Sequence, residues 1–302
     1  MSMPNDSPGT AEKQIPQEAA RAVDNFEEAR SAIARYALRS VLTAEGWEAN
    51  AKFTQSRNAD VGQRSKADTF SDALAEQRRY GTEFIGFEGD KDFDGLPGIL
   101  KEVFGEDLLD HCLIEKIVHH QNEVLVVEGA QHYLIPADEY EALLATTPAV
   151  AARRFRAFNA SSQNAHPAAK RYDRLPIVMY SFVGESLSDK EYLPPRFRED
   201  EKLKLYKLGT VAHEVAHSVY GSLLDESQLE KWRHLNESNA SLTAYASSYE
   251  GRSEQWLEEQ FGEAVRLYLS DVDYLHKSAP ELLHFIEKNF PSIKRNGLSA
   301  TV

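Results

Sequence analysis

One segment, residues 208–220, constrains the fold of this chain more than any other. It reads LGTVAHEVAHSVY, and its apolar residues recur at steps of three and four, which predicts a helix with one buried face. His213 and His217 are four residues apart, so on such a helix their side chains lie one above the other. We therefore expect a partly buried helix that carries two neighbouring imidazoles.

The two histidines have the spacing of metal ligands. Imidazoles placed in this way can close on one tetrahedral zinc ion at about 2.0–2.1 Å each. Glu214 lies about 100° farther round the helix, where it can reach a water molecule at the metal and act as a general base. The alternative is a solvated helix face of histidine and glutamate, but the small apolar neighbours Ala212 and Val215 favour burial.

A second segment, residues 256–268, offers a third ligand. It also has an apolar stripe at helical spacing, and Glu259 and Glu263 lie beside that stripe, four residues apart. A catalytic zinc site takes three protein ligands, and a metal-bound imidazole needs a carboxylate at its other ring nitrogen. One glutamate as ligand and one a turn later as its support would supply both. The alternative is an exposed acidic helix face.

These segments resemble the gluzincin metallopeptidases, and within them the family of the anthrax lethal factor catalytic domain. The resemblance covers residues 175–295 and rests on four pieces of sequence. They are HEVAH at 213–217, LTAY at 242–245, EQFGEAVRL at 259–267, and the closing segment at 278–291.

The resemblance implies a zincin-like fold and a zinc-dependent endopeptidase that hydrolyses peptide bonds. It implies that His213, His217 and Glu259 bind Zn²⁺ and that Glu214 is the general base. By the same resemblance, Glu263 supports a ligand and Tyr245 donates a hydrogen bond to the oxyanion.

The sequence departs from the family pattern in the loop before the second helix. Tyr245 precedes Glu259 by a longer interval than in that family, so Tyr249 stays a rival for the oxyanion role. Gly262 stands where relatives usually have alanine, and we expect it to weaken the helix slightly without touching a ligand. The spacing to Glu263 favours Glu259 over Glu258 as the metal ligand.

An apolar run before the metal helix, LPIVMYSF at 175–182, predicts a strand. In zincins an edge strand at this place in the order holds the substrate backbone by strand addition. Ile177, Val178 and Met179 are therefore the candidate substrate-binding residues. The alternative is an interior strand, because the run is apolar on both faces.

The order of elements predicts an α+β protein, with strands first and helices after them. We expect a disordered lead at 1–20, a helical extension at 21–80 and a catalytic domain at 81–302. Within that domain we expect strands at 84–87, 114–119 and 123–127, the last two paired as a hairpin around Gln121 and Asn122. An Ala/Arg-rich helix is expected at 149–158. After residue 200 we expect helices, interrupted by one polar loop at 236–253.

Composition narrows the function classes. Lys and Arg number 34 against 48 Asp and Glu, a net charge of −14, which disfavours nucleic acid as a partner. We expect a protein or peptide substrate and no membrane segment. The single Cys112 suits a reducing compartment, and the first residues do not read as a secretory signal. The protein is thus expected in the cytoplasm or exported by a route that needs no signal peptide.

Two alternatives to an ordinary peptidase stay open at this stage. One is a binding or regulatory protein that keeps a zincin fold without turnover. The other is an effector or toxin protease that acts inside another cell. The sequence leaves the oligomeric state, the cleavage site and the physiological substrate open.

Other polar patterns carry weaker signals. Residues 90–95, DKDFDG, imitate the start of a calcium loop, but Lys101 stands where a bidentate glutamate is needed, so we expect a surface turn. His119 and His120 are adjacent on a strand and should point to opposite faces. His234 is expected to be exposed on a helix, and Cys112 to be a small core residue.

Overall fold

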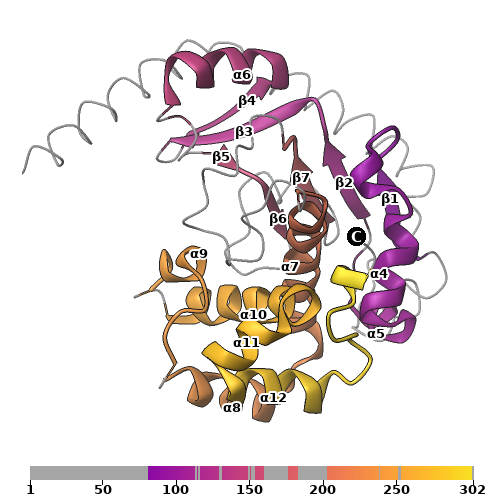
Figure 1. Cartoon of the computed structure of the whole chain (residues 1–302), viewed down its shortest axis with the longest axis vertical. Coiled ribbons are helices and arrows are strands. Elements are labelled where there is room, and N and C mark those ends of the chain that lie inside the picture. The colour runs from indigo at the N-terminus through magenta and orange to yellow at the C-terminus, as the bar shows by residue number, and fades with distance from the viewer. Residues whose placement is uncertain are drawn as a thin grey trace, which may run out of the picture.

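The chain folds as an α+β protein, as predicted, with small sheets followed by a set of helices (Figure 1). The structure is a computed structural model. The lead at 1–20 and the extension at 21–80 lie outside the residues that it describes. Those are residues 81–112, 114, 116–128, 131–148, 150, 154–159, 176–182, 203–237, 239–250 and 253–300.

A four-stranded mixed sheet has the strand order β1-β2-β7-β6. Its first three strands run parallel, and the last runs antiparallel to its neighbour. Their bounds are β1 Glu83–Ile85, β2 Lys116–His120, β7 Pro176–Tyr180 and β6 Ala157–Asn159. Between β1 and β2 the chain forms the 3₁₀ turn η1 (Lys91–Phe93) and the helices α4 (Leu96–Phe104) and α5 (Glu106–His111). Such a crossover is what a parallel pair requires.

A second, three-stranded antiparallel sheet has the order β4-β3-β5. The strands are β3 (Glu123–Glu128), β4 (Gln131–Pro136) and β5 (Arg154–Phe155), and α6 (Ala137–Thr146) packs against β3 and β4. This unit has a small core of its own, made of Val124, Val126, Tyr133, Ile135, Tyr140, Leu143 and Val150.

Two predictions in this region are wrong. The expected hairpin does not form, because β2 pairs with β1 and β7 while β3 pairs with β4 and β5. The turn at Gln121 and Asn122 instead leads the chain from one sheet to the other. The expected helix at 149–158 is replaced by β5 and β6, since pairing with β3 and β7 outweighs the helix propensity of alanine and arginine.

The C-terminal half is helical, as predicted, and is built around α7 (Leu203–Leu223). α7 packs against β6 and β7 on one side and against α10 on the other (Figure 1). A capping box of Asp225 and Gln228 starts α8. The following helices are α8 Glu226–Asn236, α9 Ala244–Ser247, α10 Ser253–Ser270, α11 Val272–Ser278 and α12 Pro280–Asn289.

The chain end closes the main core by returning to α4. The backbone N–H of Lys294 donates to the carbonyl of Val103, and the short turn η7 (Leu298–Ala300) follows. One buried apolar cluster therefore extends from Phe93 to Leu298 and includes the apolar face of α7. Among the described helices, none is both long and apolar enough to cross a bilayer.

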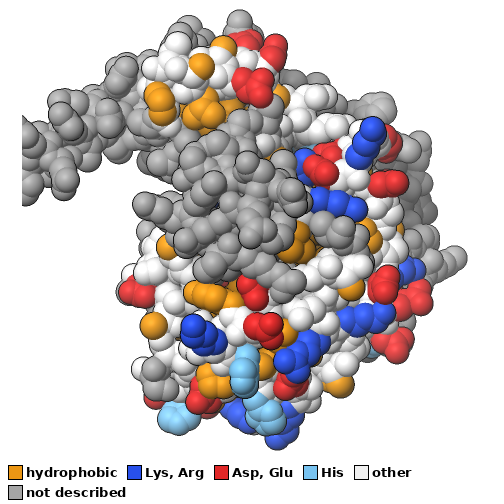
Figure 2. Space-filling model, viewed as in Figure 1, with side chains coloured by type: hydrophobic (Ala, Val, Ile, Leu, Met, Phe, Trp, Pro, Cys, Tyr) orange, Lys and Arg blue, Asp and Glu red, His pale blue; other side chains and the backbone are white. Residues whose placement is uncertain are grey.

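On the face shown in Figure 2, acidic and basic side chains intermingle over the C-terminal helices. The visible surface there carries no large patch of a single charge.

Candidate metal centre

The helix α7 brings the two histidines of the HEVAH segment together inside the protein. His213 and His217 are 4% and 5% exposed, and their ring centroids lie 4.7 Å apart. The apolar residues of the segment, among them Val211 and Val215, are fully buried. The alternative of a solvated histidine face is therefore wrong.

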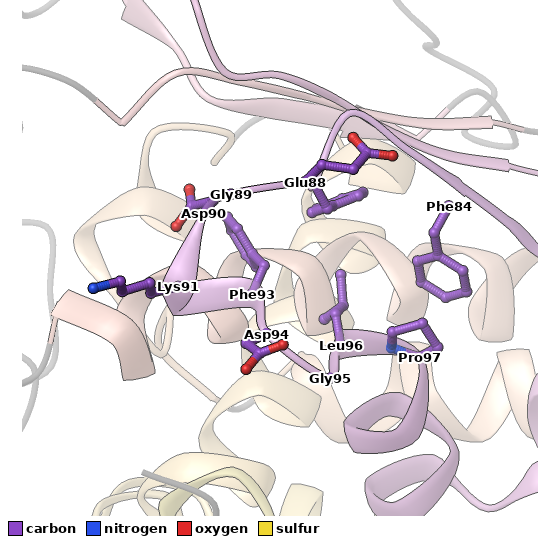
Figure 3. Close-up of a pocket in the computed structure, with 11 residues that line it drawn as sticks. Phe84, Glu88, Gly89, Asp90, Lys91, Phe93, Asp94, Gly95, Leu96 and Pro97 are labelled. Atoms are coloured by element: carbon purple, nitrogen blue, oxygen red, sulfur yellow. The ribbon is translucent and has the colours of Figure 1, made fainter.

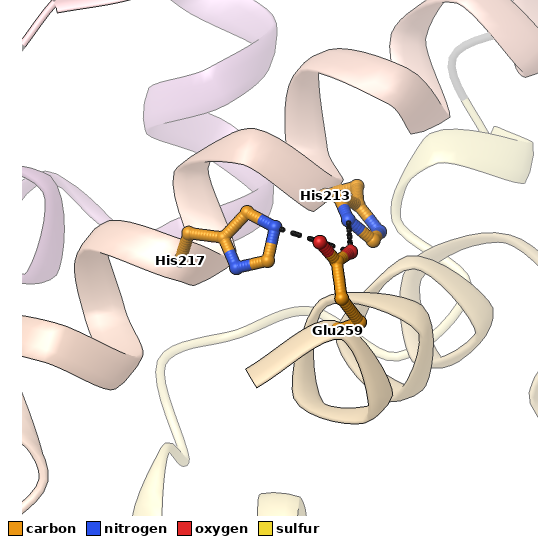
Figure 4. A group of neighbouring side chains, drawn as sticks. All are labelled: His213, His217 and Glu259. Atoms are coloured by element: carbon orange, nitrogen blue, oxygen red, sulfur yellow. Dashed lines mark hydrogen bonds and ion pairs between the residues drawn. The ribbon is translucent and has the colours of Figure 1, made fainter. Parts of the chain in front are cut away.

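Glu259 of α10 meets both imidazoles (Figure 4). Its Oε2 atom lies 3.1 Å from Nε2 of His213 and 3.6 Å from Nε2 of His217. Two ligands of a tetrahedral zinc ion, each at 2.0–2.1 Å, are about 3.4 Å apart. The three side chains, whose ligand atoms all lie within 4.8 Å of one another, could hold a metal ion.

Glu263 lies on the far side of the first imidazole, at the place predicted for a supporting carboxylate. Its Oε1 atom is 2.8 Å from Nδ1 of His213. Its other oxygen accepts a hydrogen bond of 2.5 Å from Nη2 of Arg266. Glu263 is fully buried, so this arrangement fixes the carboxylate between a cation and the imidazole.

The cluster is rich in buried negative charge. Glu258, Glu259 and Glu263 of α10 are all buried beside the histidines, as is Glu214 of α7, and Arg266 offsets one of these charges. Buried charges of one sign need a compensating charge. A cation bound among these side chains would supply it, and so do protons on the two imidazoles.

The pKa values of the cluster reflect the same surplus of buried negative charge. Burial by itself lowers the pKa of His213, but its hydrogen bonds to Glu259 and Glu263 raise that pKa to about 10. The pKa of His217 is also raised, because the charge of Glu259 outweighs burial. Burial raises the pKa of Glu259, but the charge of His217 and the hydrogen bond from His213 lower it below its ordinary value. A bound metal would take the place of these protons, since it needs neutral imidazoles.

Glu214 is buried beside the cluster and is not one of the residues that could hold the ion. Burial raises the pKa of its carboxyl, and the nearby imidazoles of His217 and His213 oppose that rise. Its backbone carbonyl accepts a hydrogen bond from the side chain of Asn159 on β6. The same amide nitrogen is 2.7 Å from the hydroxyl of Ser218.

The two candidate tyrosines lie together above the first histidine. Thr243 caps the short helix α9, which carries Tyr245. The Tyr245 ring is 5.6 Å from the His213 ring, edge to face. The Tyr245 and Tyr249 hydroxyls are 3.3 Å apart. Burial and the negative charge of Glu259 raise the pKa of Tyr245 well above its ordinary value, so its hydroxyl keeps its proton.

The prediction that Ile177, Val178 and Met179 hold substrate on a free edge is wrong. All three are fully buried, and each pairs with β2 on one side and with β6 on the other. The alternative of an interior strand is confirmed. In the described strand order β6 comes last, and it pairs with β7 and packs against α7.

The weaker patterns behave as expected. The carboxylates at 90–95 form a turn in which Lys207 of α7 supplies the cation, 3.8 Å from Asp90 and 2.5 Å from Asp92. The ring of His119 packs among Phe87, Phe93 and Phe182, whereas the ring of His120 stacks on Tyr180. The His234 side chain is 80% exposed, and Cys112 is fully buried.

A cavity of about 450 Å³ lies apart from this cluster (Figure 3). Its walls are the rings of Phe84, Phe87 and Phe93 with Leu96 and Pro97, and Glu88 and Asp94 also line it. All its lining residues come from 84–97, so none belongs to the histidine–glutamate cluster.

Sequence reasoning missed three contributors to the centre. Asn159 was hidden in a segment expected to be a helix. Glu258 was considered only as a rival ligand, but it lies 3.4 Å from Nδ1 of His217. Gly262 leaves room for the His213 ring, because a Cβ atom there would be 2.7 Å from Cε1 of His213. Its position between two functional glutamates on one helix face was the available signal.

Fold and site together define a class: an α+β protein with a buried cluster on two crossing helices that could hold a metal ion. Comparisons with family models, curated proteins and solved structures found no match for the chain.

Proposed function

We propose that this protein is a zinc-dependent endopeptidase with a zincin-like fold. The observation that carries the proposal is the joint burial of His213, His217 and Glu259, whose ligand atoms all lie within 4.8 Å of one another, beside a second acidic residue, Glu214. Two imidazoles and one carboxylate form a donor set of catalytic zinc sites, which leave one position open. Zinc bound there would supply a Lewis acid and lower the pKa of water toward about 7.

The chain's own residues would move the protons. Glu214 takes a proton from the attacking water and passes it to the leaving amine, a role for which burial suits a carboxyl. Tyr245 keeps its hydroxyl proton and donates a hydrogen bond to the oxygen of the scissile carbonyl as negative charge develops. Glu263 holds the His213 ring.

We assign peptide binding by strand addition to β6, because β7 is an interior strand. β6 is the outer described strand beside α7, and Asn159 ties it to the backbone of Glu214. An extended peptide along β6 would therefore lie next to the general base. In this proposal the substrate is an extended peptide rather than a compact small molecule.

The substitution Glu214→Gln tests the mechanism. We expect the variant to bind zinc as the wild type does and to lose nearly all hydrolysis, because an amide cannot accept the water proton. Zinc content by elemental analysis and digestion of a peptide library with sequencing of the new N-termini measure the two effects. Glu254→Gln, an exposed residue of α10, is the matched control and should cleave normally.

Two outcomes contradict the proposal. A wild-type protein that holds zinc but cuts no peptide would be a binding protein without turnover. A Glu214→Gln variant that cleaves at the wild-type rate would remove Glu214 from the mechanism.

A further inference from the structure

The helix α10 places a carboxylate at every ring nitrogen of the two histidines. Glu259 faces Nε2 of both rings. Glu263 faces Nδ1 of His213, and Glu258 faces Nδ1 of His217, at 3.4 Å. Glu258 is 7% exposed, so this contact lies inside the protein.

From this arrangement we infer that Glu258 is a positioning residue that orients His217 as a metal ligand. The inference rests on the proposed metal site but not on peptidase activity. An imidazole can bind a metal through Nε2 only if its proton is on Nδ1, and the partner of Nδ1 decides which nitrogen carries that proton. Nδ1 of His217 is buried and has no hydrogen-bond partner among the described residues, and the Glu258 carboxylate 3.4 Å away is placed to accept its proton and so favour the required tautomer.

The two supporting glutamates, Glu258 and Glu263, lie on either side of Glu259 in the sequence, and the geometry of α10 explains this placement. His213 and His217 are one turn apart on α7, and α10 crosses α7 with Glu259 between them. The support for His213 comes from one turn after Glu259, and the support for His217 comes from the residue just before it. Adjacent helical residues point about 100° apart. Glu259 therefore faces Nε2 of the His217 ring, and Glu258 faces Nδ1 of the same ring.

The test compares zinc dissociation constants, measured by competition with a chromogenic chelator, for the wild type, Glu258→Ala, Glu258→Gln and Glu254→Gln. Loss of a carboxylate that supports a ligand weakens metal binding about 10–100-fold, and we expect this for Glu258→Ala. Glu258→Gln removes the charge but keeps an oxygen that can accept the Nδ1 proton, so it should lose less affinity. Glu254→Gln removes the same charge one turn earlier on α10, at an exposed side chain, and should bind zinc as the wild type does.

Two further measurements separate positioning from a general effect on the fold. The thermal midpoint of the metal-free Glu258→Gln protein should match that of the wild type. The visible absorption of the Co²⁺-loaded Glu258→Ala variant should differ from that of the wild type, because the orientation of one imidazole changes.

Each result decides between the possibilities. Equal losses in Glu258→Ala and Glu258→Gln would show that charge alone matters and would overturn the positioning role. Wild-type affinity in Glu258→Ala would overturn it as well. If the wild type itself binds no zinc, the proposed metal site fails first, and that result is distinct from a failure of Glu258.

Discussion

At the residue scale, the two phenols above His213 compete for one chemical role. Tyr245 contacts the imidazole directly, whereas Tyr249 reaches the centre through the Tyr245 hydroxyl. A group that contacts the oxyanion affects the chemical step without changing zinc or substrate binding. Tyr245→Phe should therefore lower kcat about 10²-fold at nearly constant KM and full zinc content.

Tyr249→Phe is the matched control for this prediction, because it removes a hydroxyl from the same loop. We expect it to keep nearly wild-type kcat. Steady-state kinetics on the two single variants decide the assignment. The reverse pattern would transfer the role to Tyr249.

A second prediction at this scale concerns Gly262, over which the His213 ring lies. A Cβ atom at this position would come within 2.7–2.9 Å of three atoms of that ring. Because the ring also contacts Glu259 on one side and Glu263 on the other, it cannot move away without leaving its ligand position. Gly262→Ala should therefore weaken zinc binding.

The same substitution should not weaken the metal-free protein, since alanine improves helix propensity by about 1 kcal/mol and a ring without metal is freer to shift. Chelator competition and urea unfolding in EDTA measure the two opposite effects. Gly221→Ala on α7 has open space around its added methyl group and should leave zinc affinity unchanged. Normal zinc affinity in Gly262→Ala would show that α7 and α10 can move apart to admit the added methyl group at no cost, and would contradict the prediction.

At the scale of elements, Asn159 joins strand β6 to helix α7. Its amide donates to the carbonyl of Glu214 and to the hydroxyl of Ser218, in a fully enclosed position. Asn159→Ala removes both of these hydrogen bonds, which should cost about 1–3 kcal/mol in unfolding free energy. It should also lower kcat/KM at normal zinc content, because β6 then no longer holds a fixed position beside Glu214.

Ser218→Ala removes only one acceptor and is the control for Asn159→Ala. Its cost should be smaller, about 0.5–1.5 kcal/mol. Denaturant unfolding and peptide hydrolysis measure both variants. If Asn159→Ala keeps wild-type stability and activity, the strand is held by its pairing with β7 alone.

The sequence predicted the elements that carry their own periodicity. The stripes on α7 and α10 are long, so they predicted helix type and buried face. The meeting of Glu259 with His213 and His217 was expected from the ligand needs of a zinc site and from the family resemblance. Strand partners were not predictable in this way. The run at 123–127 is recognisable as a strand, but nothing local distinguishes β2 from β4 as its neighbour.

The segment at 149–158 failed for a related reason. Alanine and arginine favour a helix in isolation, and only the pairing of Arg154 with β3 and of Ala157 with β7 makes these residues strands. The error hid Asn159. Long-range pairing thus decides which strand lies beside α7, and a single sequence does not contain it.

At the scale of the whole molecule, His119 links stability to pH. Its ring is 4% exposed and packs 5.2 Å from the ring of Phe87 and 5.1 Å from that of Phe93. The pKa of His119 is lowered to about 4, mainly by burial and in part by the charges of Lys207 and His120, against the opposing charge of Asp90. In the unfolded chain the pKa of a histidine is about 6.5.

The direction of the pH dependence follows from these two pKa values. Between about pH 6.5 and about pH 4 the unfolded chain binds a proton at His119 that the folded protein does not, so stability falls as the pH falls through this window. One such group contributes a loss of about 2 kcal/mol between about pH 8 and about pH 5. The unfolding free energy of the wild type should therefore fall by about that much more than that of His119→Leu over this range. Other titrating groups, among them His120 and the metal ligands, are common to both proteins, so the difference between the two curves isolates His119. Urea unfolding at a series of pH values measures the unfolding free energy of both proteins. If the two plots of unfolding free energy against pH are parallel, His119 is protonated in the folded protein at no cost, and the prediction is wrong.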